Sequence, residues 1–209
     1  MLTVKEINTC NNLHKIPKSI HINKGVCFDS RLLHALDAPD ERDYKYDFDV
    51  YLPTYGINLQ RPYVWEHCQQ NEFILSILLE KPIDPVIIVQ HINDVNRRDV
   101  NTVNYVIDGK QRLMTIQKFV HNEFPIIVNH KEYYWRDFDE EAQMFFKSRV
   151  NYLTGTVYYS YEDTPVTDDM KIILFNFYNF AGTPQTEEHK RRLQAFYNMG
   201  RYENIDLEH

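Results

Sequence analysis

Hydrophobic and polar residues follow two different periods in the middle of the chain. Residues 48–52 alternate between apolar and polar positions, which predicts a half-buried strand ending at Pro53. The stretch 66–80 carries apolar side chains at helical spacing and predicts a helix, which Pro82 stops. The continuous apolar run 86–89 predicts a strand buried on both faces. This region therefore mixes strands with a helix.

A second strand and helix are predicted around one glycine. Residues 103–107 have the pattern of a strand, Asp108-Gly109 forms a turn, and residues 110–121 carry an apolar stripe of helical period. Further on, residues 126–128 and 133–135 flank a polar stretch and predict a hairpin. The chain thus passes from a strand through a glycine directly into a helix.

The C-terminal part is predicted to be mostly helical. Helices are expected at 139–148, 167–180 and 186–200, each starting at or next to an Asp or Thr that can cap it, with one strand at 157–161. The predicted fold class is α+β, with a small mixed sheet and inserted helices followed by a mostly helical C-terminal half.

Residues before 46 show no strong period. The stretch 37–49 holds six acidic residues against Arg42 and Lys45, which predicts an exposed connection because like charges repel and are hard to pack. We expect four segments: an irregular N-terminal extension (1–45), an α+β core (46–165), a helical C-terminal subdomain packed on the core (166–206), and an expression-tag remnant (207–209).

Composition narrows the class of protein. The chain has 209 residues, 43% of them hydrophobic and 14% aromatic, which excludes intrinsic disorder. No apolar run reaches the roughly 18 residues of a membrane-spanning helix, and no leader segment is visible, so we expect a cytoplasmic protein without a membrane partner. The net charge of −7 argues against broad DNA wrapping but allows one small cationic pocket.

Cysteines and histidines give no sign of a metal framework. The three cysteines are widely spaced, as in a protein with reduced thiols. Cys10, His14, His21 and Cys27 are irregularly spaced and form no Cys-x-x-Cys pair. We therefore expect no zinc, and no haem, in this protein.

The segment 105–112, Tyr-Val-Ile-Asp-Gly-Lys-Gln-Arg, carries the sharpest chemical signal. A strand that turns through Gly109 into a helix aims the free N–H groups of the first helical turn at one point, which suits an anion. Arg112 can fold back to the same point and offer a planar fork for phosphate oxygens. Asp108 can hold a magnesium ion, orient a water or cap the helix.

The same segment has two other interpretations. A P-loop is disfavoured, because no glycine lies five residues before Gly109 and Gln111 stands where Ser or Thr is needed. A capped helix with a surface arginine fits the same residues without any ligand.

A second signal lies in the loop before the helix at 66–80. Asn58, Gln60, Arg61, Tyr63 and Trp65 gather amides, a guanidinium and two aromatic rings in eight residues, which can frame a nucleotide through stacking and edge contacts. The alternative is a packed loop in which the rings belong to the core and Arg61 bonds backbone carbonyls.

These motifs together resemble the N-terminal domain family of GmrSD-type restriction endonucleases, which is similar in fold to ParB nuclease-like and sulfiredoxin-like domains. The resemblance runs from about Asp47 to Arg192. It rests on four stretches: Gln60–Trp65, Ser76–Leu78 with Pro82-Ile83, Ile107–Leu113 with Thr115, and Asn179–Pro184.

The resemblance implies a nucleotide site. The family's Asp-Gly-Gln-Gln-Arg signature, tied to nucleotide binding and hydrolysis, falls on Asp108, Gly109, Gln111 and Arg112, and Lys110 replaces its first Gln. Asp108, Gln111 and Arg112 would be catalytic. The expected cofactor is a nucleoside triphosphate with Mg²⁺, the metal being held at Asp108. The resemblance also implies Gln60 and Arg61 on the facing loop and Asn179 from the C-terminal helical half. Together with the residues singled out above, the expected nucleotide-binding set is Gly109, Lys110, Arg112, Asn58, Gln60, Arg61, Tyr63 and Asn179.

Three functions stay open from the sequence. The first is a nucleotide-binding, NTP-hydrolysing domain of a restriction system directed at modified DNA. The second is a ParB-like domain that binds or cuts DNA directly, and the third is a non-enzymatic subunit. No His-Asn-His nuclease module is visible, so we expect DNA cleavage to need a separate nuclease subunit.

Overall fold

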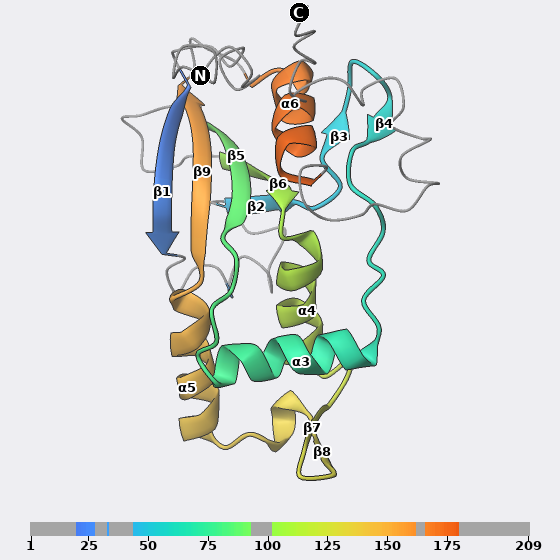
Figure 1. Cartoon of the computed structure of the whole chain (residues 1–209), viewed down its shortest axis with the longest axis vertical. Helices are drawn as coiled ribbons and strands as arrows, with labels where there is room; N and C mark the ends of the chain where they lie inside the picture. The colour runs from blue at the N-terminus through green and yellow to red at the C-terminus, as the bar shows by residue number, and fades with distance from the viewer. Residues whose placement is uncertain (1–19, 28–32, 34–43, 93–101, 162–165, 180–209) are drawn as a thin grey trace, which may run out of the picture.

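A five-stranded mixed sheet forms the centre of the molecule (Figure 1). The computed structural model describes residues 20–27, 33, 44–92, 102–161 and 166–179. The strand order is β1-β9-β5-β6-β2. These strands are β1 (His21–Cys27), β2 (Tyr44–Asp47), β5 (Val86–Ile92), β6 (Thr102–Asp108) and β9 (Thr154–Tyr161). Strand β9 runs antiparallel to β1 and parallel to β5, while β6 is antiparallel to β5 and parallel to β2.

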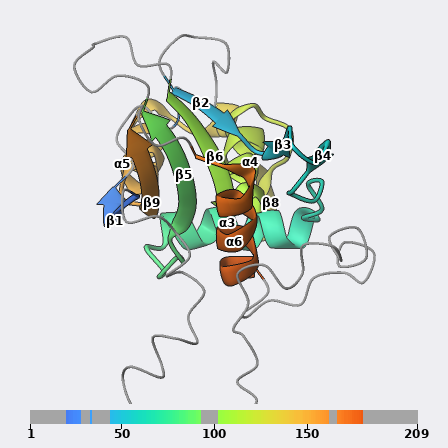
Figure 2. The same ribbon diagram turned by 90° about the horizontal axis from the view of Figure 1, so that it is seen from above.

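Helices cover both faces of this sheet. On one side lie α3 (His67–Leu78), α4 (Lys110–Val120) and α5 (Glu140–Asn151), with α3 packed against the other two. On the other side α6 (Asp168–Asn179) lies against β6, as the view from above shows (Figure 2). The described residues thus confirm the predicted α+β class.

Four short strands and a 3₁₀ turn complete the described fold. Strands β3 (Tyr51–Leu52) and β4 (Ile57–Asn58) pair antiparallel near α6, and β7 (Ile126–Val128) pairs with β8 (Lys131–Tyr133) in a hairpin that extends beyond α3 at the bottom of Figure 1. A 3₁₀ turn, η2 (Trp135–Asp137), links the hairpin to α5.

Two hydrophobic cores, one on each face of the sheet, hold these layers together. Strand β5 serves both, because Val86 and Ile88 enter the core under α3, α4 and α5 while Ile87 and Val89 enter the core under α6. All four side chains are buried. This explains the unbroken apolar run, since a strand covered on both faces has no polar side. The prediction of a doubly buried strand is confirmed.

The predicted strand at 48–52 is wrong over its first three residues. The Asp47 carboxylate accepts hydrogen bonds from the backbone N–H of Asp49 at 3.0 Å and of Val50 at 2.8 Å, which bends the chain and leaves Val50 at φ 50°. An Asp side chain competing with strand pairing in this way is typical of a turn. The burial pattern still holds, because Val50 and Leu52 are both fully buried.

The acidic stretch 37–49 is also not the wholly exposed connection that its charge predicts. Its last part forms β2, which pairs with β6 at the edge of the sheet. Tyr46 packs against the core and stacks on Phe48 at 6.2 Å between ring centroids. An edge strand pairs on one side only, so its charged residues keep access to water. Strand β1, from the predicted irregular extension, forms the other edge.

The hairpin is shifted from its predicted position. Its second strand is Lys131–Tyr133 rather than 133–135, and the turn consists of Asn129 and His130, both at positive φ. Such two-residue turns match the twist of the strands and need positive φ at both positions. The predicted helix at 186–200 lies outside the described residues, as do most residues of the N-terminal extension.

Candidate functional site

Strand β6 passes through Gly109 straight into α4, as the sequence predicts. Gly109 has φ 105°, and a Cβ there would lie 2.9 Å from both Cγ atoms of Val86. Only glycine fits such a turn. Gly109 is itself the N-cap and no side chain caps α4, so the suggestion that Asp108 caps the helix is wrong. The first N–H groups of α4 are left for another partner.

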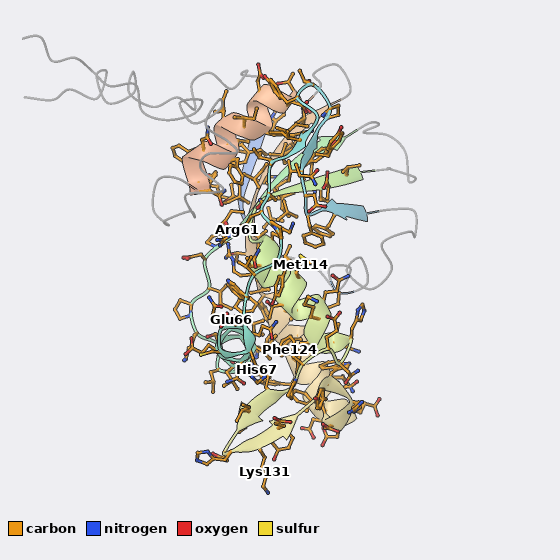
Figure 3. All side chains as sticks on the ribbon, turned by 90° about the vertical axis from the view of Figure 1, so that its right-hand side faces the viewer. Arg61, Glu66, His67, Met114, Phe124 and Lys131 are labelled. Atoms are coloured by element: carbon orange, nitrogen blue, oxygen red, sulfur yellow. The ribbon has the colours of Figure 1, made fainter. Side chains whose placement is uncertain are left out.

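A pocket of about 180 Å³ opens at this helix N-terminus. It lies between the start of α4, the loop before α3 and the last turn of α6. Figure 3 shows Arg61 at this level, between α6 above and α3 below. The lining residues are Gln60, Arg61, Trp65, Asp108, Gly109, Lys110, Gln111, Arg112, Phe175 and Asn179. Most of the residues singled out in the sequence are therefore brought together.

The Arg112 guanidinium bonds groups of its own protein through both terminal nitrogens. Its Nη2 donates to Asp108 Oδ2 at 2.8 Å and to the carbonyl of Pro85 at 3.3 Å, and its Nη1 donates to the carbonyl of Asp84. Arg112 therefore fixes the Asp108 carboxylate and the segment that leads into β5. A planar guanidinium suits this task because its donors have a fixed geometry.

Asp108 stands at the end of β6 with its side chain 39% exposed. Arg112 holds one of its oxygens, and no further partner of the carboxylate occurs among the described residues. It is the only carboxylate on the pocket wall within that part of the chain. Asp108 thus presents an oriented, accessible oxygen beside the helix N-terminus.

Lys110 has a partner that the sequence did not indicate. Its side chain is 5% exposed, and Nζ lies 2.7 Å from Asp49 Oδ1. A buried ammonium needs a carboxylate nearby, because an unpaired buried charge is costly. Lys110 therefore lines the pocket as half of an ion pair and joins the start of α4 to the bend after β2. The only hint in the sequence was that Asp49 lies in an acidic stretch.

Two amides anchor the pocket walls to the end of β6. Gln60 Nε2 donates to the carbonyls of Val106 and Ile107, each at 2.7 Å, and Asn179 Nδ2 donates to the same Ile107 carbonyl at 3.0 Å. The loop before α3 and the end of α6 are thus attached to one point. The roles of Gln60 and Asn179 in this structure are to shape the pocket.

Three other predicted site residues make structural contacts. Gln111 lines the pocket but also bonds the backbone of Val64 at 2.9 Å and of Pro62 at 3.1 Å. The Tyr63 hydroxyl lies 2.8 Å from Thr115 Oγ1, and Asn58 pairs with Tyr51 across β3 and β4. Neither Tyr63 nor Asn58 is part of the pocket wall.

Arg61 differs from these neighbours. Its half-buried side chain lines the pocket, and its guanidinium has no hydrogen-bond or ion-pair partner among the described residues. The packed-loop alternative is therefore wrong, among the described residues, in its expectation that Arg61 bonds backbone carbonyls, while Trp65 does pack against the core as that alternative expected. Arg61 and the uncapped start of α4 are the groups of this pocket best able to receive an anion.

The family model of the GmrSD restriction endonuclease, N-terminal domain, matches residues 42–203. The chain belongs to this family. The matched region includes the loop before α3, the β6–α4 turn and α6, so it contains every wall of the pocket. Membership indicates a component of a restriction system.

No curated protein and no solved structure matches the chain. The similarity to ParB-like and sulfiredoxin-like folds stays a prediction. No helix in the described part of the chain is long and apolar enough to cross a membrane. Within the same residues, no group of three or more His, Cys, Asp or Glu side chains is placed to hold a metal ion.

Proposed function

We propose that this GmrSD N-terminal domain binds a nucleoside triphosphate with magnesium and hydrolyses it, as part of restriction directed at modified DNA. The observation that carries the proposal is that the Arg61 guanidinium, which has no partner among the described residues, lines the same pocket as the N-terminus of α4, which no described side chain caps. Both favour negative charge at one place. Family membership supports the restriction context.

The two arginines take different roles in this proposal. Arg61 donates to phosphate oxygens, since its fork is not engaged by the described residues. Arg112 is a positioning residue, because its donors already hold Asp108 and the carbonyls of Asp84 and Pro85. Asp108 then orients a water or a magnesium ion next to the phosphate. Preorganised charges of this kind lower the barrier to phosphoryl transfer.

The pocket fits magnesium only together with phosphates. Mg²⁺ commonly takes one or two carboxylates, several waters and the oxygens of a bound nucleotide. Asp108 supplies one carboxylate, and no cluster of three metal-capable side chains occurs among the described residues. When bound, the ion would neutralise charge on the phosphates, and Asp108 would be its protein ligand.

Thermal unfolding with nucleotide tests the proposal. ATP, GTP, CTP and UTP, each with Mg²⁺, are added to the full chain and to Arg61→Gln. At least one nucleotide should raise the midpoint of the wild type, because a ligand of the folded state stabilises it. The shift should be smaller in the variant than in the wild type. The variant should also release less phosphate from the nucleotide than the wild type does. The proposal fails if no nucleotide shifts the wild type, or if Arg61→Gln keeps the full shift.

The size of the pocket favours one second candidate, direct binding of a DNA backbone phosphate. A volume of about 180 Å³ is below the roughly 300 Å³ at which pockets for drug-sized ligands begin, so the base of any nucleotide would lie outside it. A gel-shift titration of modified and plain duplexes at several salt concentrations tests this. Binding by this route should weaken steeply with salt, and absence of binding at low salt rejects it.

If both tests are negative, the third function, a non-enzymatic subunit, becomes the better account. A separate nuclease subunit that copurifies with the full chain would then be expected. This outcome would also explain a pocket whose polar side chains mostly serve to join elements of the fold.

A further inference from the structure

A second cavity, of about 410 Å³, lies away from the signature residues. It is formed by the last turn of α3, the segment that follows it, and the C-terminal end of α5 with the start of β9. None of its lining residues lines the pocket at Gly109. It is also more than twice as large as that pocket.

The polar side of this cavity has more cationic donors than acidic acceptors. Arg149 Nη2 lies 2.6 Å from Glu80 Oε1, and its guanidinium lies 4.6 Å from the centroid of the Phe145 ring. Its Nε atom is buried and has no hydrogen-bond partner within the described residues. Lys81 adds a second cation, which has no partner among the described residues. The cavity wall thus carries two cations and one carboxylate.

The remaining walls are apolar and partly accessible. Ile77 and Leu153 are buried and belong to the wall, with Ile83 beside them. Tyr152 also lines the cavity and is 69% exposed, so much of its side chain is accessible to a ligand. Exposed aromatic side chains next to apolar walls are typical of ligand pockets.

A role in stabilising the fold accounts for only part of this arrangement of charged side chains. Lys81 and Arg149 stand at the C-terminal ends of α3 and α5, where cations offset the helix dipoles. That role does not explain why Arg149 Nε is buried without a hydrogen-bond partner in the described part of the chain. Glu80 has φ 55° because α3 ends in a Schellman motif, in which the N–H groups of Glu80 and Lys81 bond the carbonyls of Ile77 and Ser76. In this turn the Glu80 carboxylate lies 2.6 Å from Arg149 Nη2.

We propose that this cavity binds a small organic anion with a carboxylate or phosphate group on a flat apolar body. The anionic group accepts hydrogen bonds from Arg149 and Lys81, and the apolar body packs against Ile77, Leu153 and the Tyr152 ring. Glu80 then acts as an internal competitor that occupies Arg149 when the cavity holds no anion. The proposal is independent of nucleotide hydrolysis at Gly109.

Phenyl phosphate is a suitable probe, with inorganic phosphate and phenol as its separate halves. Each is titrated into the full ¹⁵N-labelled chain, and amide shifts are followed by NMR. Phenyl phosphate should bind more tightly than either half. Arg149→Met should weaken it roughly tenfold or more, because it loses charge-assisted hydrogen bonds. Glu80→Gln should tighten binding, because it removes the competing carboxylate. Arg61→Gln should leave it unchanged.

Tyr152→Ala keeps the test valid if Arg149→Met fails to fold. Tyr152 is largely exposed, so its loss should not disturb the core. It should weaken phenyl phosphate but not inorganic phosphate. The proposal is overturned if Glu80→Gln weakens binding, if Tyr152→Ala has no effect, or if phenyl phosphate does not bind. It is also overturned if Arg61→Gln abolishes binding, since the probe would then occupy the pocket at Gly109.

Discussion

Arg112, in the first turn of α4, donates a hydrogen bond of 2.8 Å to Asp108, the last residue of β6. The same guanidinium also bonds the carbonyls of Asp84 and Pro85, just before β5. The last residue of one strand, the first turn of a helix and the entrance to a neighbouring strand therefore share one side chain. In this arrangement Arg112 serves to position Asp108.

We predict that Arg112→Lys lowers kcat for nucleotide hydrolysis more than it raises KM. Lysine keeps the charge but loses the fixed fork, so Asp108 is no longer oriented. The free energy of unfolding should fall by about 1–3 kcal/mol from the lost hydrogen bonds. Steady-state kinetics and urea unfolding measure the two effects. A rise in KM with unchanged kcat would show instead that Arg112 binds the phosphates itself.

Arg61→Gln should affect nucleotide affinity much more than it affects stability, unlike Arg112→Lys. The guanidinium has no partner among the described residues, so the free energy of unfolding should change by less than about 0.5 kcal/mol. Affinity for nucleotide should drop roughly tenfold or more, because a charged donor to phosphate is lost. Calorimetric titration provides the affinity. Lys131→Gln, which removes a cation on the distant hairpin (Figure 3), is the matched control and should bind as the wild type does.

Gly109→Ala should destabilise the protein by about 2 kcal/mol or more, since the new Cβ adds a steric clash to a backbone conformation that alanine disfavours. The clash is with Val86, whose Cγ atoms would lie 2.9 Å away. Gly56→Ala is the control, because Gly56 has φ 66° but open space around it. Adding Val86→Ala should lower the additional cost of Gly109→Ala. If both glycine variants lose equal stability, the contact with Val86 has no role.

Stability should fall in acid in a way that depends on Asp168. Burial of this carboxyl raises its pKa, but hydrogen bonds from Thr54 and Lys171 outweigh burial and hold the pKa below its ordinary value of 3.8. The folded state therefore binds the proton more weakly than the unfolded state. The resulting stabilisation is complete above the ordinary pKa. It is lost as the pH falls through the lower pKa that Asp168 has in the folded state.

Urea unfolding between pH 2.5 and 6 measures this effect. We expect Asp168→Asn to be less stable than the wild type at pH 6, because Lys171 is buried 3.2 Å from the lost charge. The difference should shrink toward the acid end of the range. A difference that is constant with pH would mean that protonation of Asp168 is not linked to folding.

The sequence predicted best the elements whose signal is local. Apolar periods and capping residues correctly predicted strands β5 and β6 and helices α3, α4 and α5. For example, the Asp139 carboxylate accepts a hydrogen bond from the N–H of Ala142 at the start of α5. The Gly109 turn was also expected, because only glycine allows its backbone. Such features depend on a few neighbouring residues.

The features that the sequence did not predict depend on residues far apart in the chain. The pairing of Lys110 with Asp49 spans 61 positions, and the attachment of Asn179 to Ile107 spans 72. No period or motif encodes which distant partner a polar side chain meets. For this reason the sequence indicated the residues of the pocket but not that Arg112 is engaged and Arg61 is not.

The segment Glu80–Pro85 links the two cavities, because it lines the larger one and bonds Arg112, which lines the pocket at Gly109. At one end Glu80 is paired with Arg149 in the larger cavity, and at the other end the carbonyls of Asp84 and Pro85 are bound by Arg112 beside Gly109. Surface connections usually tolerate insertions, but this one is anchored at both ends over six residues. Its length is therefore set by the spacing of the two cavities. In engineering this domain, an added residue here should disturb both at once.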